Sequence, residues 1–269
     1  MKGLELIRHR RSVRTFDGQD LRPEHLQQVL DCAESAENPY RIAIEWRMLS
    51  AKADGLTSPV ISGTDTWIAG KVKQVPHAEE AFGYSFEKVV LYAESIGLGT
   101  TWIAGTMNRP VFEKAMDLQA DEKLPCVSPL GYPAKKMALR EVLMRKGVGA
   151  DKRMKFEELF FSNSFDKPLS ESEAGELAEP LEMVRWAPSA VNKQPWRVVL
   201  ADGKAHFYEK RSRGYLAPDG WDLQKVDMGI ALYHFEYGLC CQGKKPEFRI
   251  EDPGIPTPPD TFYLASYTL

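Results

Sequence analysis

Apolar residues recur every three or four positions in four stretches of the chain, a spacing that predicts helices with one buried face. Two long helices are predicted over residues 78–95 and 224–237. Two shorter ones are predicted to begin at residues 21–24, where Pro23 suits a first turn, and at 170–173, where serine and glutamate have capping-box spacing. The first and second parts of the chain therefore show the same order of a short helix and a long one.

Shorter runs rich in β-branched and aromatic residues lie between and after these helices and predict strands. The runs cover residues 41–49, 67–72, 196–201, 205–208 and 262–267. Strands and helices do not alternate regularly, as they would in a doubly wound parallel sheet. The pattern therefore predicts an α+β fold.

A weak internal repeat divides the chain. The pattern Ala-x-Ser-Ala-x-Asn occurs at residues 33–38 and 187–192, and Leu-Tyr followed by Gly-Leu at the same spacing occurs at 91–98 and 232–239. The order is the same both times, although chance recurrence of so short a pattern is the alternative to a duplication. A duplication predicts two halves joined by a polar, turn-forming linker. These halves are residues 1–162 and residues 166–269.

Composition narrows the class of protein. The 269 residues carry a formal charge of −3, so the chain as a whole has no electrostatic footprint for nucleic acid or an anionic membrane. The four cysteines lack Cys-x-x-Cys spacing and the five histidines lack metal-ligand spacing, so no metal site is predicted. No apolar stretch is long enough to span a bilayer, and the basic N-terminal stretch does not resemble a signal peptide. We expect a reduced, cytoplasmic protein that buries a core of its own.

Residues 8–14 contain four arginines and a serine just before the first predicted helix. Guanidinium groups form paired, charge-assisted hydrogen bonds with phosphate, and a serine hydroxyl adds one more donor. Such dense positive charge in an acidic chain indicates an anionic ligand. A solvated basic arm and a surface for an acidic partner are the alternatives.

Other segments have residues that could touch a flat ligand. Residues 187–196 lead from a predicted helix into a strand and offer hydroxyl and amide groups that can hydrogen-bond the edge of a heterocycle. Residues 97–105 have glycines that can end a helix and let the backbone approach a ligand closely. Residues 129–133 and 152–159 read as a turn and a basic helix start. Each segment also has an ordinary structural explanation as a turn or a helix end.

Five motifs in these segments coincide. They are Arg10-Arg11-Ser12-Val13-Arg14-x-Phe16, Gly97-Leu98-Gly99-Thr100-x-Trp102, Leu130-Gly131-Tyr132-Pro133, the basic pair Lys152-Arg153 before Phe156-Glu157-Glu158, and Ala187-Pro188-Ser189-Ala190-x-Asn192-x-Gln194-Pro195-Trp196. Together they resemble the FMN-dependent nitroreductase family, over nearly the whole chain. The resemblance implies a nitroreductase-like α+β fold with a central antiparallel sheet flanked by helices and two pseudo-symmetric halves.

The order of the motifs departs from that of ordinary family members, in which each of two FMN sites in a homodimer takes residues from both subunits. Here the first half has the arginine motif but only an eroded counterpart of the proline-serine motif at residues 33–38. The second half has the intact proline-serine motif but only Gly238-Leu239-Cys240 in place of the glycine motif. The resemblance therefore implies a fused pseudo-dimer that keeps one FMN site between its halves and can remain a monomer.

The resemblance also implies which residues bind the cofactor. They are Arg10, Arg11, Ser12, Arg14, Leu98, Gly99, Thr100, Lys152, Arg153, Pro188, Ser189, Ala190 and Asn192. Arg14 would stabilise negative charge on the reduced flavin, and no side chain is implied as a catalytic nucleophile or base. NADH or NADPH would supply the hydride, and nitroaromatics, quinones or similar electron-poor small molecules would accept it in a ping-pong cycle.

Three alternatives to this function stay open. The same scaffold could carry another flavin reaction, such as dehalogenation or flavin destruction, with residues 51–66 as a lid. The chain could bind or sequester flavin without turnover. The arginine cluster could instead bind an acidic partner and no flavin.

Overall fold

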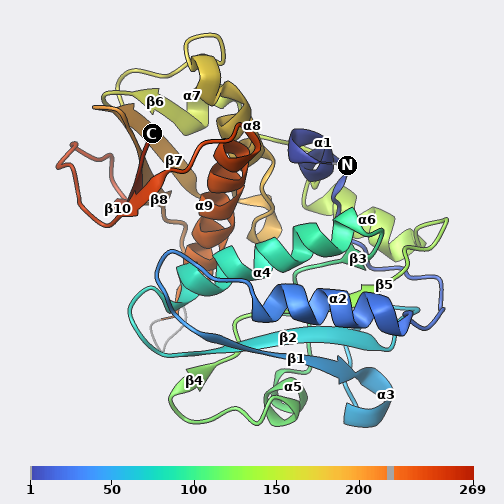
Figure 1. Cartoon of the computed structure of the whole chain (residues 1–269). Helices are drawn as coiled ribbons and strands as arrows, with labels where there is room; N and C mark the ends of the chain where they lie inside the picture. The colour runs from blue at the N-terminus through green and yellow to red at the C-terminus, as the bar shows by residue number, and fades with distance from the viewer. Residues whose placement is uncertain (1, 217–220) are drawn as a thin grey trace.

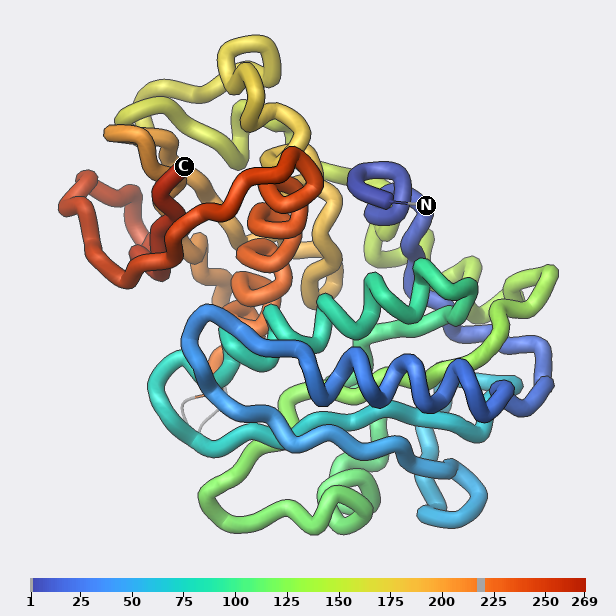
Figure 2. Tube along the Cα trace, viewed as in Figure 1, coloured from blue at the N-terminus to red at the C-terminus, as the bar shows by residue number. Residues whose placement is uncertain are grey.

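The computed structural model describes residues 2–216 and 221–269 (Figures 1 and 2). The α-helices are α1 Gly3–His9, α2 Pro23–Glu34, α3 Ala51–Asp54, α4 Ala78–Ser95, α5 Arg109–Ala115, α6 Leu139–Gly147, α7 Phe156–Leu159, α8 Ala178–Trp186 and α9 Leu223–Cys241. The strands are β1 Ile44–Ser50, β2 Thr66–Lys73, β3 Gly99–Thr100, β4 Glu122–Lys123, β5 Val127–Gly131, β6 Phe160–Ser162, β7 Trp196–Ala201, β8 Lys204–Lys210, β9 Glu247–Arg249 and β10 Thr261–Thr268. Short 3-10 turns, η1 Gly175–Leu177 and η2 Ala190–Asn192, lie on either side of α8.

The first sheet lies in the first half and is antiparallel throughout. Its strands are ordered β1-β2-β5-β3, and β4 also pairs with β2. Alternate residues of β2 point to opposite faces, as the strand period requires. Ile68 packs in one cluster with residues of α2 and α4, whereas Trp67 and Ala69 pack in another with Phe112 of α5. Helices therefore cover both faces of this sheet (Figure 1).

The second sheet has the strand order β6-β7-β8-β10-β9. Its order β7-β8-β10-β9 matches β1-β2-β5-β3, and α8 and α9 occupy the places that α2 and α4 have in the first half. Each half thus carries its own sheet, where the resemblance led us to expect one central sheet. The second sheet is not purely antiparallel either, because β6 runs parallel to β7.

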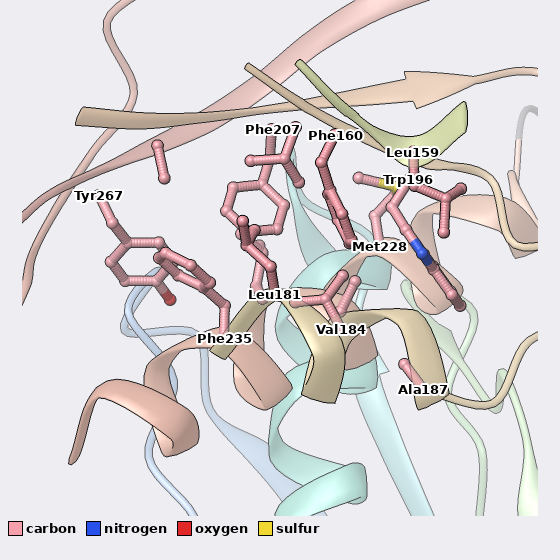
Figure 3. Packing of buried hydrophobic residues seen from close by; sticks show 14 of the residues in the cluster. Leu159, Phe160, Leu181, Val184, Ala187, Trp196, Phe207, Met228, Phe235 and Tyr267 are labelled. Carbon is pink, nitrogen blue, oxygen red and sulfur yellow. The ribbon is translucent and has the colours of Figure 1, made fainter. Parts of the chain in front are cut away.

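β6 belongs to the first half in sequence but to the second half in space. It pairs with β7, and the segment leading into it buries Phe156, Leu159 and Phe160 in one cluster with Trp196 and Phe207 (Figure 3). Burying an aromatic or leucine side chain stabilises a fold by roughly 1.5–3 kcal/mol. The last residues of the first half therefore complete the core of the second half.

Most elements predicted from the sequence are confirmed to within a few residues. They are α2, α4, α9, β1, β2, β7, β8 and β10. The helix expected to begin at residues 170–173 begins later. Ser170 and Glu173 do form the reciprocal capping hydrogen bonds, but they close a turn, and Gly175 with φ +56° separates that turn from α8. Similarly, β1 starts after Arg41, whose φ of +56° is incompatible with a strand.

α4 and α9 cross at the centre of the molecule in a reciprocal contact (Figure 2). A Cβ atom on Gly83 would lie 2.0 Å from the carbonyl oxygen of Val226, and one on Gly229 would lie 2.0 Å from that of Glu80. Each glycine thus meets the carbonyl three residues before the other, as a pseudo-twofold axis between the helices requires. No helix in the described residues is both long and apolar enough to cross a membrane.

The ends of these two helices correct the register of the sequence repeat. α4 ends with Gly97 at φ +83°, and the Leu98 N–H donates to the carbonyl of Ala93. α9 ends in the same way, with Gly243 at φ +77° and the Lys244 N–H donating to the carbonyl of Leu239. The structural counterpart of Gly97 is therefore Gly243. The pairing of Gly97-Leu98 with Gly238-Leu239 is wrong, since Gly238 lies inside α9 against Pro180.

A buried hydrogen-bonded chain also joins the halves. The Trp102 indole donates to Glu87 Oε2 at 3.0 Å, and Glu87 Oε1 lies 2.9 Å from His234 Nε2. His234 Nδ1 lies 2.8 Å from the Met183 carbonyl, which can only accept, so Nδ1 carries a proton. The second nitrogen faces the Glu87 carboxylate, and both side chains of the His234–Glu87 pair are fully buried.

Candidate functional site

The arginine motif runs alongside the glycine motif. Ser12 forms a parallel bridge with Thr100, and the Val13 N–H donates to the Thr100 carbonyl at 2.8 Å. Gly99 lies directly against Val13, because a Cβ atom there would sit 2.8 Å from the valine side chain. A larger residue at Gly99 would push the arginine motif away from β3. The two motifs thus form one surface of the first half.

Three arginines of this region have buried N–H groups that lack hydrogen-bond partners among the described residues. The unpartnered atoms are Nε and Nη1 of Arg10, Nε of Arg14 and Nε of Arg153. Arg10 is only 8% exposed. Buried donors are almost always paired, and an unpaired one costs about 1–3 kcal/mol. The arrangement therefore lacks an acceptor.

The electrostatics of these arginines also favour an anion. Burial, together with the neighbouring charges of Arg10 and Arg185, lowers the pKa of Arg153 to about 10. Burial also lowers the pKa of Arg14, an effect that Glu141 opposes and Arg145 reinforces. A bound anion would reverse both shifts, because it stabilises the charged guanidinium groups.

Glu141 of α6 already holds part of the arginine motif. Its side chain is buried, and its carboxylate accepts from Arg11 Nη1 at 3.0 Å and from the Arg14 backbone N–H at 3.3 Å. The Arg11 guanidinium is therefore engaged by a carboxylate, whereas Arg10 and Arg14 keep unpartnered donors. Nothing in the sequence marked Glu141, because it stands alone in an otherwise basic segment.

The proline-serine motif of the second half forms a hydrogen-bonded loop. Ser189 Oγ accepts from the Gln194 N–H at 2.9 Å, and Gln194 Oε1 accepts from the Met154 N–H at 2.9 Å. Asn192 Nδ2 donates to the carbonyls of Gly149 at 2.8 Å and Lys152 at 3.0 Å. The loop of the second half is thus attached to the basic segment of the first.

The backbone of this loop is strained. Val191, Asn192 and Gln194 have φ values of +42°, +59° and +51°. A left-handed conformation is unfavourable for a β-branched residue such as Val191, and such residues persist only where surrounding contacts hold them. The side-chain hydrogen bonds of Asn192 and Gln194 supply those contacts.

Asp227 of α9 holds the loop through hydrogen bonds with its backbone. Its carboxylate accepts from the Ala190 N–H at 3.0 and 3.1 Å, and the side chain is buried. Burial raises the pKa of Asp227 well above its ordinary value, and the charges of Asp222 and Glu209 raise it further. Sequence reasoning missed this residue because it lies inside α9, five residues after the N-cap Asp222, and no local pattern marks its contact with Ala190.

Arg153 joins the two halves at the arginine cluster. Its Nη2 donates to the Trp186 carbonyl at 3.3 Å, and its guanidinium carbon lies 4.8 Å from the centre of the Trp186 ring. The structure thus places Arg153 near Arg10 and at the end of α8, from which the proline-serine motif continues.

The remaining expected cofactor residues have less direct placements. Leu98 is buried in the core with α2 and α4, so only its backbone could face a ligand. The Lys152 side chain is exposed, and its contribution to the loop is its carbonyl group. Thr100 has a buried hydroxyl without a partner among the described residues. The contacts that Pro188 and the other expected residues would make with the cofactor stay predictions.

The pseudo-symmetric position on the other side of α4 and α9 has a different chemistry. Asn38, the counterpart of Asn192 in the repeat, uses its amide to hold the Ile42 carbonyl at 2.8 Å. Tyr40 stacks on His77 at 5.0 Å and meets the edge of Phe248 at 4.9 Å. These aromatic side chains line an open hollow of about 530 Å³. Arg249 also lines the hollow, and its guanidinium group is paired with Glu247.

Within the described residues, no three His, Cys, Asp or Glu side chains are grouped so as to hold a metal ion.

Comparison with known proteins shows the family to which the chain belongs. The family model described as "Putative TM nitroreductase" matches residues 3–239. The chain belongs to this nitroreductase family. Membership makes the protein an oxidoreductase. No curated protein shows significant similarity to this nitroreductase.

A solved structure shows the same fold over the length of the chain. A "putative nitroreductase" from Thermotoga maritima is 20% identical, with a TM-score of 0.65, and the match covers 100% of this chain and 94% of that one. An FMN-dependent nitroreductase from Clostridium difficile R20291 matches over 52% of this chain and 94% of its own, at 16% identity and a TM-score of 0.42. A "Putative NADH dehydrogenase/NAD(P)H nitroreductase" from Bacteroides thetaiotaomicron matches over 49% of this chain and 87% of its own, at 25% identity and a TM-score of 0.43.

Proposed function

We propose that this nitroreductase is an FMN-dependent NAD(P)H oxidoreductase with a single FMN site between its two halves. The observation that supports the proposal is the set of buried arginine donors without partners on Arg10, Arg14 and Arg153. A phosphate group offers several acceptor atoms and about two negative charges, which fit these planar donors. The residues present therefore suit the phosphate end of FMN.

The chain's own residues would bind and orient the cofactor. Arg10, Arg14 and Arg153 would lie along the phosphate, ribityl and pyrimidine ends of the cofactor, with Arg14 near the ring, and Ser189, Ala190 and Asn192 would approach the ring from the second half. Asp227 positions the Ala190 N–H, and Gln194 fixes the loop through Met154. When bound, FMN supplies the capacity to accept a hydride and pass reducing equivalents on. The positive charge of Arg14 favours the reduced, negatively charged cofactor.

The acceptor class that this architecture favours is an electron-poor small molecule, such as a nitroaromatic or a quinone. NADH or NADPH and the acceptor would use the same space in turn. Ping-pong kinetics then give parallel lines when the reciprocal rate is plotted against the reciprocal concentration of NADH or NADPH at several fixed acceptor concentrations. Saturable FMN binding without oxidation of NADH or NADPH by any of these acceptors would identify a flavin-sequestering protein instead.

The phosphate site is tested by comparing FMN with riboflavin, which lacks the phosphate. We expect the wild type to bind FMN at least ~100-fold more tightly, since hydrogen bonds to charged groups contribute about 1.5–3 kcal/mol each. Arg153→Ala should reduce FMN affinity about 10- to 100-fold and leave riboflavin affinity within about twofold. Equal losses for both ligands in a fluorescence titration would remove Arg153 from the phosphate site.

A further inference from the structure

Helix α6 exposes apolar side chains on its outer face and buries a carboxylate on its inner face, the reverse of an ordinary surface helix. Leu139, Val142 and Leu143 lie on one face by their spacing of three and four, and they are 74%, 45% and 60% exposed. The opposite face carries Glu141, which is 2% exposed and binds Arg11. A helix at a protein surface normally buries its apolar face and exposes its charges.

Apolar exposure in this protein is concentrated at α6 and its flanks. Of the eleven large apolar side chains that are exposed among the described residues, five lie between residues 137 and 148. They are Met137, Leu139, Val142, Leu143 and Val148. Single exposed apolar residues need no explanation, but a group of neighbours at one place indicates an interaction surface.

The same segment concentrates positive charge in a chain of net charge −3. Residues 135–148 contain Lys135, Lys136, Arg140, Arg145 and Lys146 against one acidic residue, Glu141, whose carboxylate points inward to Arg11. The three lysines are exposed and form no ion pair within the part of the chain that the structure describes. The outer surface of the segment is therefore both apolar and strongly basic.

We propose that the segment 135–148 docks on an anionic lipid surface, with α6 lying in the plane of the interface. Leucine and valine side chains would enter the headgroup region, and the lysine stems would lie along the lipid with their ammonium groups at the phosphates. The net charge of −3 for the whole chain does not reveal this local concentration of positive charge. The patch is short, so binding is weak and reversible.

Docking would place the arginine cluster close to the lipid surface. Glu141 connects α6 directly to Arg11 and to the backbone of Arg14, so the helix cannot move without the motif. That consequence rests on the proposed FMN site, whereas binding to lipid does not need the flavin. The two ideas can therefore fail separately.

The test is sedimentation of the full-length protein with vesicles of phosphatidylcholine, with and without about 30% phosphatidylserine. We expect binding only to the anionic vesicles, with marked weakening at high salt. The variant Lys135→Gln/Lys136→Gln/Lys146→Gln should bind about 100-fold more weakly, at roughly fivefold per charge. Leu139→Ser/Leu143→Ser should lose binding by at least ~10-fold. Ile250→Ser, at a residue that is 49% exposed elsewhere, should bind as the wild type does.

Other outcomes would overturn the proposal. Binding that does not depend on phosphatidylserine, or no sedimentation of the wild type, contradicts an anionic lipid surface. A wild-type dimer that Leu139→Ser/Leu143→Ser converts to monomer in size-exclusion chromatography would assign the face to a second copy of the chain. Circular dichroism and urea unfolding of each variant show whether it is folded, and neither measurement depends on the proposed FMN site.

Discussion

Arg14 combines a buried, unpartnered N–H with a pKa lowered by burial. Arg14→Ala should therefore weaken FMN binding about 10- to 100-fold, because a charge-assisted hydrogen bond is lost. It should also lower the reduction potential of bound FMN, since a positive charge near the ring favours the reduced form. Fluorescence titration and a redox titration measure the two effects.

Lys204 provides a matched control, because it is a partly exposed cation whose nearest carboxylate, on Glu251, is 4.0 Å away. Lys204→Ala should leave FMN affinity and potential unchanged. Equal effects of the two substitutions would count against the placement of the site.

Asp227 makes stability depend on pH in a defined direction. Burial raises its pKa, so folding takes up a proton at pH values between the ordinary carboxyl pKa of about 4 and the raised value. This contribution destabilises the fold as the pH rises through that window. Asp227→Asn keeps an acceptor for the Ala190 N–H without the charge, so it should flatten the decline. Urea unfolding at acidic and at weakly alkaline pH tests this, and parallel pH profiles for variant and wild type would contradict it.

At the residue scale, sequence indicated the arginines and the proline-serine motif because dense guanidinium groups and clustered amides have few purely structural uses. It could not indicate Glu141 or Asp227. Each is an isolated acidic residue whose role comes from a contact more than thirty residues away in the sequence, to Arg11 and Ala190. Such contacts depend on the packed fold, not on a local pattern.

At the element scale, the crossing of α4 and α9 depends on Gly83 and Gly229. Gly83→Ala should destabilise the protein by at least ~3 kcal/mol, because the new methyl group would overlap the Val226 carbonyl and force the helices apart. Gly147→Ala is the matched control, since a Cβ atom there has no neighbour within 4 Å. It should be neutral or stabilising by up to ~1 kcal/mol. Similar midpoints of chemical unfolding for both variants would refute the close crossing.

The His234–Glu87 pair ties the same two helices together. His234→Ala leaves Glu87 buried without its partner and should cost about 3–5 kcal/mol. Removing both groups should cost less than the sum of the two single substitutions, which is the signature of a direct interaction. Additive losses in urea unfolding would show that the pair is not coupled.

Periodicity predicted the long helices and the central strands well, because these elements have a strong apolar pattern. It did not predict α6 or the pairing of β6. α6 lacks a buried apolar face, and β6 is a three-residue strand whose partner lies in the other half. The start of α8 was also misplaced, since a capping pattern at Ser170 closes a turn as readily as a helix.

At the scale of the whole molecule, the chain contains two halves of similar fold, and the two sides of the α4–α9 pair differ in chemistry. The repeated strand order, the reciprocal glycines and the matching helix ends support an internal duplication. The arginine cluster occurs on one side of the α4–α9 pair, and stacked aromatic side chains occupy the other. β6 connects the halves through a shared core, so neither half is expected to fold alone.

The ratio of FMN to chain after saturation tests the central claim most directly. It is measured by flavin absorbance and confirmed by releasing the cofactor on denaturation. The account predicts one FMN per chain, because among the described residues the buried arginine donors without partners, on Arg10, Arg14 and Arg153, lie on one side of the molecule. Two FMN per chain would show that the aromatic side also binds flavin, and none would contradict the proposed site.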